Sequence, residues 1–339
     1  MHKLQKYIIS NLSILFISIF SALFTIASVI FLIKLATFTA VIQLSIWEMT
    51  KLYIFVLPEI LFYTLPITFF IAATLSIFRL SNDNEIIVLF SLGIHPKFLL
   101  RILFKPALFL SILLLVNYLI IVPKARVLSQ GFISYKKSEA KFNLSASEFG
   151  HKFGKWLLYI GESSNDGTYG NVFLFNKNNK EEILIGAKKA EVINEGGLLR
   201  LKLQNGEGYS YSNESFSQIN FETMYINDTL KAKSKKFTSP LKYWQSKKRK
   251  ASRTRMIITN TLISIFPLIS LFLVAAIGIV HVRHQKAKIY LYLFLSIVLY
   301  YGATLGLQSL LVFYTIPIVA ITWLIVTYMI YKKTILARF

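Results

Sequence analysis

The sequence contains two groups of three long apolar segments, separated by a polar stretch from Pro123 to Arg255. The hydrocarbon core of a bilayer is about 30 Å thick, so a helix needs roughly 20 apolar residues to cross it. Each segment meets or approaches that length. We therefore predict an α-helical membrane protein with six transmembrane helices in a three-plus-three arrangement. The predicted spans are Ile8–Ile33, Leu52–Phe78, Phe98–Val122, Met256–Val280, Ile289–Leu311 and Val312–Ile330.

The composition supports this class of protein. Hydrophobic residues make up 55% of the 339 residues, and the mean hydropathy is +0.55. The first apolar segment is uncharged and longer than the roughly 7–15 residues of a signal-peptide core, so we interpret it as a retained span. The chain has no cysteine, which excludes disulfides and thiolate metal sites.

The distribution of lysine and arginine predicts the orientation. Short cytoplasmic loops carry an excess of these residues, whereas long loops are largely exempt. With the N-terminus inside, 12 basic residues lie in short inside segments, and only Lys34 and Lys51 lie in short outside loops. A basic run just before the fourth span favours the opposite orientation for that helix. We nevertheless predict cytoplasmic termini, transmembrane regions at 1–123 and 256–339, and an extracytoplasmic domain at 124–255.

The inserted domain has the pattern of an all-β fold. Residues 199–203 alternate between leucine and basic side chains, as a half-buried strand does. Several short antiparallel strands in this length indicate a sandwich or jelly roll. Asn171–Phe175 is apolar on both faces, which fits a fully buried strand or a sheet face that stays open as an apolar groove. The predicted strands are Lys155–Gly161, Asn171–Phe175, Glu182–Val192, Leu198–Gln204, Tyr209–Tyr211 and Ser217–Ile226.

The chain is strongly basic, with a net charge of +22. The inserted domain is basic as well, but its aromatic residues follow strand patterns and form no identifiable stacking platform, so we predict membrane lipids and no nucleic acid as partners. Lys231–Arg255 contains 11 basic and no acidic residues. This stretch is either a solvated linker or a segment lying on anionic headgroups, with Tyr243 and Trp244 as interfacial anchors.

The segment between the second and third spans predicts a short helix at Asn82–Leu92. Ser81 is a candidate N-cap, Asp83 and Glu85 suit the first turn, and Gly93 suits the C-terminal cap. Pro96 then begins the next helix. The apolar run within the helix, 86–90, is costly in water unless something covers it. The helix is therefore either an interfacial turn or a coupling helix that docks into a cytoplasmic partner.

Few ionisable residues lie within the spans. Glu59 is a functional candidate by default, although a solvated or lysine-paired structural role is equally compatible with its position. Lys34 and Lys51 are snorkelling anchors or contacts for an anionic lipid head. Nucleotide-binding, zinc-protease and serine-hydrolase motifs are absent, and the five histidines are dispersed. We predict no catalytic residue, no metal site and no cofactor on this chain, so its energy source must be another protein.

Taken together, these residues resemble the LptF/LptG permease family of the lipopolysaccharide-export ABC transporter. The resemblance covers essentially the whole chain and is most specific at Arg79–Ile94, within which Glu85–Gly93 is similar to the family pattern E-[LI]-x-V-[ML]-x-[AS]-x-G. Leu57-Pro58-Glu59 with Pro66, and the strand Trp156–Glu162, are more similar to LptF than to LptG. In the family, the segment around Glu85–Gly93 is the coupling helix. The resemblance therefore implies that the ATPase is engaged by Asp83, Glu85, Ile86, Leu89 and Gly93.

The resemblance also implies a mechanism and its partners. Lipopolysaccharide is expected to enter a cavity between this chain and a homologous permease subunit, and then to pass through the jelly roll to a periplasmic bridge protein with a bitopic anchor. A cytoplasmic ABC ATPase dimer uses ATP and Mg²⁺ to drive this movement in the bacterial inner membrane. The residues expected to meet the substrate are Lys34, Lys51, Glu59, Phe173 and Phe175. The alternatives are an ABC permease for another lipid or lipoprotein, and an extracytoplasmic sensor.

Overall fold

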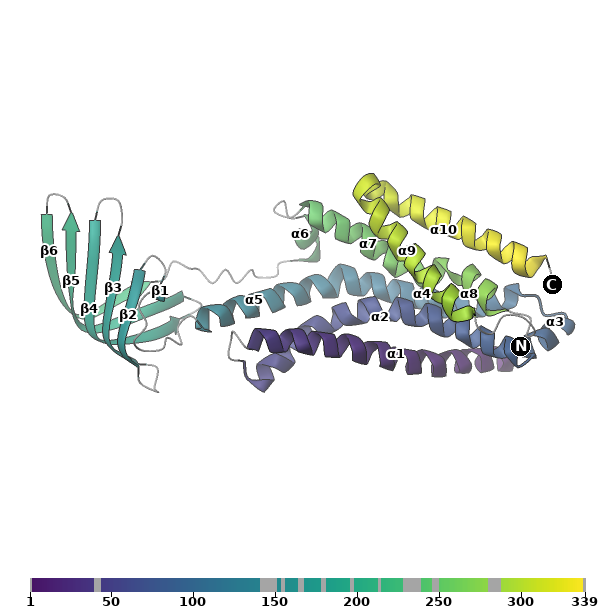
Figure 1. Ribbon diagram of the computed structural model, residues 1–339, viewed down its shortest axis with the longest axis horizontal. Helices are drawn as coiled ribbons and strands as arrows, with labels where there is room; N and C mark the ends of the chain where they lie inside the picture. Colours follow the sequence, from purple (N-terminus) through teal and green to yellow (C-terminus); the bar gives the residue numbers. More distant parts are fainter. Residues whose placement is uncertain are drawn as a thin grey trace. The chain divides into compact units, whose positions relative to one another are not determined.

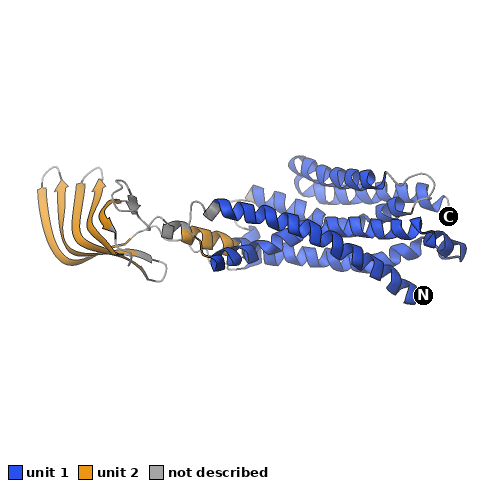
Figure 2. Ribbon diagram, turned by 60° about the horizontal axis from the view of Figure 1, so that its bottom comes forward, with its two compact units in different colours: residues 1–37, 46–126, 237–339 blue, residues 38–45, 127–236 orange. Residues whose placement is uncertain are grey.

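The computed structural model divides into two compact units (Figure 2), a helical unit and a sheet unit. The helical unit comprises residues 1–37, 46–126 and 237–339, and the sheet unit comprises residues 38–45 and 127–236. The structure describes residues 2–39, 44–140, 151–153, 156–163, 168–177, 181–195, 198–212, 215–227, 239–245, 250–279 and 288–337.

The described helices of the chain follow the apolar segments but extend beyond several of them. The helix of the third apolar segment continues beyond Val122. A π-helical turn, η1 (Asn117–Ile121), joins α4 (Lys97–Val116) to α5 (Val122–Ala140) without a break. The division between the two units falls inside α5, between Arg126 and Val127. The first half of the chain contains α1 (His2–Thr39), α2 (Ile46–Asn82), α3 (Glu85–Ser91), α4 (Lys97–Val116), η1 (Asn117–Ile121) and α5 (Val122–Ala140).

The second half begins with a short helix that the sequence did not predict. It contains α6 (Pro240–Gln245), α7 (Lys250–Ile269), α8 (Leu271–Gly278), α9 (Ile289–Leu311), η3 (Val312–Tyr314), α10 (Thr315–Tyr331) and η4 (Lys332–Leu336). The predicted fourth span is bent by 47° between α7 and α8. Ser270, at the bend, has φ −92° and ψ 3°, which are not helical values.

Four of the described helical stretches are long and apolar enough to cross a membrane, and the bent α7–α8 pair would make a fifth. One of the four is the 48-residue stretch Ile289–Leu336. Straight, it would extend about 72 Å at 1.5 Å per residue, more than twice the hydrocarbon thickness. Val312 breaks it with a φ of +46°, and α9 and α10 fold back against each other (Figure 1). The structure thus confirms several apolar helices, while the number six stays a prediction.

The core of the helical unit forms where α2 meets α7, α8 and α9. The Phe266 ring packs at a tilt against both Phe70 and Tyr300, with ring centroids 5.2 and 4.6 Å apart. At Gly278, an added Cβ would lie 2.8 Å from Ile77, so glycine permits the close approach of α8 to α2. In contrast, few of the apolar side chains described in α1 are buried: only Ile8, Leu12 and Leu35 are. In water that exposure would be unfavourable, whereas in a membrane lipid or another helix covers it.

The described strands of the sheet unit form one antiparallel sheet in which each strand pairs with its neighbours in the chain. The sheet confirms the inserted β domain. A jelly roll packs two sheets together, and the described strands form only one, so the jelly-roll fold is not confirmed. The strands are β1 (His151–Phe153), β2 (Trp156–Ser163), β3 (Thr168–Lys177), β4 (Glu181–Glu195), β5 (Leu198–Ser212) and β6 (Ser215–Asn227).

Two details of the strand prediction were wrong. The sequence did not predict β1, and it divided the single strand β5 into Leu198–Gln204 and Tyr209–Tyr211. Asn205 adopts a left-handed φ of +51° within β5, yet the register stays constant from Gln204, opposite Thr223, to Gly206, opposite Phe221. A residue type typical of turns therefore bends this strand without ending it.

The bend crosses neighbouring strands of the sheet. Asn171 in β3 also has a φ of +51°, and the register places both asparagines opposite Lys188 in β4. At the row formed by Asn171, Lys188 and Asn205, the alternation of buried and exposed side chains along the strand shifts by one position. Tyr169 and Val172 are consequently both buried although they are three residues apart. The shift keeps one apolar face continuous through the bend.

The substitution Gly206→Ala should destabilise the sheet unit by about 1–3 kcal/mol, as overpacking of a tight site does. An alanine Cβ there would lie 2.3 Å from the Gly186 carbonyl oxygen and 2.5 Å from the Phe221 ring. Gly208→Ala is the matched control, because its nearest contact would be an ordinary 3.8 Å from Ile185. Thermal melting of the purified full-length variants, followed by circular dichroism in detergent, checks this prediction. Equal melting temperatures for Gly206→Ala and Gly208→Ala would contradict the prediction.

Candidate functional site

The short helix α3 connects α2 to α4 at one end of the helical unit. It begins at Glu85, three residues later than predicted, because α2 continues through Asn82. The predicted N-cap, Ser81, is buried in the last turn of α2. Asn84, with a φ of +60°, separates the two helices and has no side-chain capping bond. The N-cap was therefore mispredicted, since the turn is made by a left-handed asparagine.

The C-terminal end of α3 is as predicted. Gly93 has a φ of +78°, and its N–H donates to the Phe90 carbonyl at 3.0 Å. The next N–H, of Ile94, donates to the Leu89 carbonyl at 3.0 Å. This pair of bonds is the Schellman motif, which glycine accommodates without Cβ strain. Pro96 then precedes α4. The C-terminal end of α3 is thus capped by its own backbone.

The side chains of α3 divide into an anchoring set and an outward set. Ile86 is fully buried in the core of the helical unit, and Phe90 packs against the same core. Val88 and Leu92 are exposed, with 73% of Leu92 accessible. An exposed leucine beside a left-handed glycine at the end of a membrane bundle is available to a partner. Ile86 therefore anchors α3 in the core of the helical unit, whereas Val88 and Leu92 form the face of this segment that a partner can contact.

Glu85 has a partner that is distant in sequence. The Tyr7 hydroxyl, on the first helical turns of α1, donates to a Glu85 carboxylate oxygen at 2.9 Å. The remaining acidic candidate, Asp83, is exposed in the turn before the helix. Nothing local in the sequence indicates the Tyr7 contact, because the two residues are 78 positions apart. The bond links the start of α1 to the candidate coupling helix.

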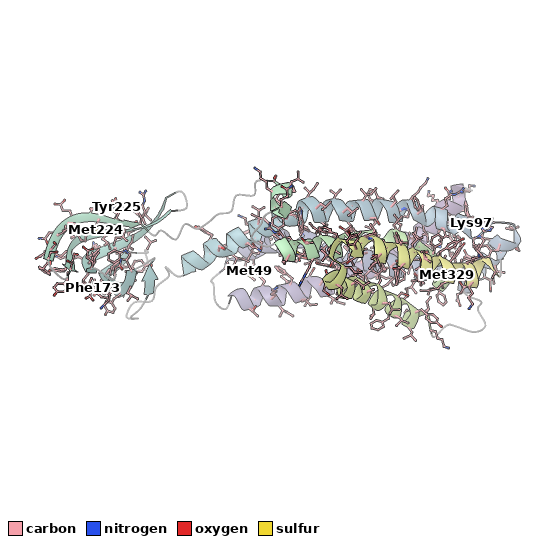
Figure 3. All side chains as sticks on the ribbon, turned by 90° about the horizontal axis from the view of Figure 1, so that it is seen from above. Met49, Lys97, Phe173, Met224, Tyr225 and Met329 are labelled. Carbon is pink, nitrogen blue, oxygen red and sulfur yellow. The ribbon has the colours of Figure 1, made fainter. Side chains whose placement is uncertain are left out.

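Lys34 and Lys51 lie at the opposite end of the helical unit from α3. Ser28 and Tyr53 join their hydroxyls at 2.9 Å, and Phe31 packs near Tyr53, so the end of α1 lies beside the start of α2. Both lysines are exposed. Figure 3 labels the nearby Met49 at this end, whereas Lys97 is labelled toward the other. The two predicted lysines therefore share one end of the unit.

Glu59 is paired, but with an arginine that the sequence analysis had placed in the inserted domain. The Arg126 guanidinium, in α5, donates from Nη2 to Oε1 of Glu59 at 2.6 Å and from Nε to Oε2 at 3.1 Å. Its Nη1 lies 3.3 Å from the Met256 sulfur of α7. This two-pronged arrangement is the strong geometry for an arginine–carboxylate pair. In the sequence, the only indication of this ion pair was that Arg126 lies one helical turn beyond the third apolar segment.

Further contacts join the same helices at this level. The Asn117 side chain, in η1, donates to the Pro58 carbonyl at 2.9 Å. On the other side of η1, the Trp244 indole N–H from α6 donates to the Leu119 carbonyl at 3.1 Å. A π-helical turn leaves backbone groups poorly paired, and this tryptophan satisfies one of them. Trp244 thus has a structural contact within the helical unit.

Most of the basic run around α6 lies outside the described residues. Within the described part, Arg253 lies over the Tyr243 ring, 4.3 Å from its centroid, and donates to the Tyr243 carbonyl. Arg253, one of the basic residues of this run, thereby holds α6 against the start of α7. Residues 228–238 and 246–249 are not described, so the choice between linker and headgroup contact stays open for them.

Phe173 and Phe175 lie in the sheet unit, on the face opposite its core. Val172 and Leu174 are fully buried, whereas Phe173 is 47% exposed and Phe175 is half-buried. The Tyr159 ring lies 6.2 Å from Phe173, and Leu184 stands opposite Phe175 in the register. Figure 3 labels Phe173 on this sheet. The strand Asn171–Phe175 therefore buries one face and leaves the other as a partly open apolar surface.

The structure thus places the predicted site residues in separate regions. Those of α3 gather at one end of the helical unit, the lysines at the other, and the two phenylalanines in the sheet unit. The described residues include no group of three or more histidine, aspartate or glutamate side chains positioned to hold a metal ion. His281 and His284 lie outside the described residues.

The family model for the lipopolysaccharide export system permease LptF/LptG matches residues 6–331. The chain belongs to this family. A comparison with individual curated proteins finds no match. As an LptF/LptG permease with several apolar helices, the chain is a multi-pass inner-membrane protein of lipopolysaccharide export. The family match covers LptF and LptG alike, so the greater similarity to LptF stays a prediction.

Proposed function

We propose that this chain is a permease subunit of an ABC transporter that extracts lipopolysaccharide from the inner membrane and delivers it to a periplasmic bridge protein. A separate cytoplasmic ATPase dimer, using ATP and Mg²⁺, supplies the energy. A second, homologous permease subunit completes the substrate cavity. The membership of the LptF/LptG family supports lipopolysaccharide as the substrate.

The main structural support for this proposal is the way in which α3 is attached to the core of the helical unit. The helix is anchored inward by the fully buried Ile86, while Leu92 is exposed beside it. We expect a partner that displaces Leu92 to displace Ile86 and the core around it as well, because one short helical segment joins the two residues. Hinge-and-shear movements of packed helices convert such local displacements into opening or closing of a distant site. Glu85 and Asp83 add negative charge for a basic partner surface.

The arrangement of the helical unit supports the proposed orientation. The start of α1, the helix α3 and the end of α10 lie at one end of this unit (Figure 1). Both termini and the coupling helix then share the cytoplasmic side, as the short basic segments predict. With α9 and α10 as separate spans, and α7–α8 as one bent span, six crossings satisfy this arrangement.

Substrate contacts are proposed at the other end. Lys34 and Lys51 are exposed there, on the side that the orientation assigns to the periplasm, where an ammonium group can meet a lipid phosphate. The exposed apolar surface of α1 suits lipid or the homologous subunit. Glu59, held by Arg126, fixes the neighbouring helices. Phe173 and Phe175 then offer an apolar surface to acyl chains in a jelly roll that the partner proteins continue.

Photocrosslinking in vesicles tests this function. A photoreactive residue at Lys34 or at Phe173 is combined with the ATPase, the second permease subunit and lipopolysaccharide. We expect an adduct at Lys34 without nucleotide and an adduct at Phe173 only with ATP. No ATP-dependent lipopolysaccharide adduct at Phe173 would contradict the export function. Adducts with another lipid alone would assign this chain to a different lipid transporter.

A further inference from the structure

Three cationic side chains follow one another at intervals of one helical turn along α4. Lys97, Arg101 and Lys105 are each four residues apart, and all three are exposed. The opposite face of the helix packs into the core of the helical unit, and its buried residues include Leu99, Leu103, Ala107 and Leu114. The three cations therefore form a row on the outward face of a helix that is long and apolar enough to cross a membrane.

The charge of this row is uncompensated in the part of the chain that the structure describes. Among those residues, no carboxylate lies within ion-pairing distance of Lys97, Arg101 or Lys105. Like charges four residues apart on a helix repel each other and destabilise it. An anion beside the row would offset this repulsion. The outward face of α4 is thus suited to a negatively charged ligand.

The level of the row along α4 indicates where that ligand lies. The 18 residues Pro106–Pro123, which follow the row, contain no charged side chain. At 1.5 Å per residue they extend about 27 Å, close to the thickness of the hydrocarbon core. Lys105 therefore lies at one edge of the hydrocarbon, and Arg101 and Lys97 lie about 6 and 12 Å farther out. This is the level of the lipid phosphates and headgroups, in the cytoplasmic leaflet of the proposed orientation.

The same face of α4 continues into the hydrocarbon as an apolar surface. Phe104, Leu108 and Ile112 are 48%, 37% and 53% exposed, and they follow the cations at spacings of three or four residues. A cationic part beside the headgroups and an apolar part beside the hydrocarbon match the two parts of an anionic phospholipid. A soluble protein is a poorer match, because it cannot reach the apolar part inside the membrane.

We propose that this face of α4 binds an anionic phospholipid, with Arg101 and Lys105 on the phosphate and Lys97 toward the outer part of the headgroup. An arginine presents a planar fork of donors to a phosphate, and a lysine one turn away adds a second charge. The lipid is distinct from the exported substrate, whose proposed contacts Lys34 and Lys51 lie at the other end of the helical unit. The site rests on the proposed function only for the identity of the leaflet. Because α3 leads directly into α4, a lipid held here also fixes the depth of the candidate coupling helix.

Native mass spectrometry of the purified full-length chain in detergent tests this site. Neither the ATPase nor lipopolysaccharide is present, so the result is independent of the export function. Phosphatidylglycerol is the anionic probe, and phosphatidylethanolamine is the zwitterionic one. We expect the chain to bind phosphatidylglycerol preferentially, and Arg101→Gln/Lys105→Gln to weaken that binding about tenfold or more, because two charge-assisted contacts are lost. Equal binding of the two lipids to the unchanged chain would overturn the proposal.

Lys332→Gln/Lys333→Gln is the matched control. It removes the same charge from two exposed residues at the same end of the helical unit (Figure 1), but adjacent residues of a helical turn point in different directions. We expect phosphatidylglycerol binding to change less than twofold. Equal losses in the two double variants would reflect general attraction to a basic surface and would overturn the site. Weaker co-purification of the ATPase with Arg101→Gln/Lys105→Gln, at unchanged lipid binding, would make the row a protein contact instead.

A second measurement locates the lipid while the three cations stay in place. Ile112→Cys gives this cysteine-free chain one attachment point for a fluorescent label, about 10 Å beyond Lys105 along the helix. In vesicles, phosphatidylglycerol with brominated acyl chains should quench the label at least twofold more strongly than equally brominated phosphatidylethanolamine at the same mole fraction. Adding Arg101→Gln/Lys105→Gln should remove this preference. Equal quenching by the two lipids with the cations in place would also overturn the site.

Discussion

Replacing Arg126 by alanine should lower the free energy of unfolding of the helical unit by about 2 kcal/mol. Fully buried ion pairs cost about 3–5 kcal/mol when one partner is removed, and exposed pairs about 0–1 kcal/mol. The side chains of Arg126 and Glu59 are 21% and 35% exposed, so the pair lies between these limits. The larger part of the loss comes from a carboxylate left unpaired among α2, α5 and α7. Thermal melting in detergent measures it.

The chain supplies a matched control for this prediction. Lys177 and Glu182 form an ion pair of similar length in the sheet unit, with each side chain more exposed than its counterpart in the Arg126–Glu59 pair. Lys177→Ala should change the melting temperature little. The double variant Glu59→Gln/Arg126→Ala should be less destabilised than the sum of its single changes, because it leaves no unpaired charge. Additive effects would show that the pair contributes nothing as a pair.

The substitution Leu92→Asp should weaken binding of the cytoplasmic ATPase at least tenfold without altering the melting temperature. Burying one leucine is worth about 1.5–3 kcal/mol, which corresponds to roughly ten- to hundredfold in affinity. A carboxylate at this position would also have to lose its water on docking. Because 73% of Leu92 is exposed, the change leaves the core of the isolated chain intact. Co-purification with the ATPase at graded concentrations measures the affinity.

Leu241 provides the control, since it is equally exposed, at 72%, and lies on α6 toward the opposite end of the helical unit (Figure 1). Leu241→Asp should leave ATPase binding unchanged. If both substitutions weakened binding equally, the effect would reflect general disturbance of the bundle. If neither did, α3 would not be the docking helix.

Features set by local chemistry were predicted from the sequence. Long apolar segments indicated the helices, alternating residues indicated most strands, and Gly93 indicated the end of α3. Each of these depends on side chains a few residues apart. The start of α3 was wrong because Asn84 adopts a left-handed conformation where a serine cap was expected. The division of β5 was wrong for the same reason, since Asn205 bends a strand that its neighbours hold in register.

Contacts between distant segments were not predictable from one sequence. Glu59 was identified as an intramembrane carboxylate, but its partner Arg126 is 67 residues away and lies just beyond the domain boundary predicted between residues 123 and 124. The Tyr7–Glu85 hydrogen bond likewise depends on how helices pack, which composition does not specify.

The most direct test of the central claim, that this chain couples an ATPase to lipopolysaccharide through α3, is the rate of ATP hydrolysis in vesicles. The chain is reconstituted with its ATPase and the second permease subunit, with or without lipopolysaccharide. We predict that lipopolysaccharide raises the rate, that phosphatidylglycerol at equal charge does not, and that Leu92→Asp abolishes the increase. An unchanged rate with lipopolysaccharide, or an equal increase in Leu92→Asp, would contradict the account.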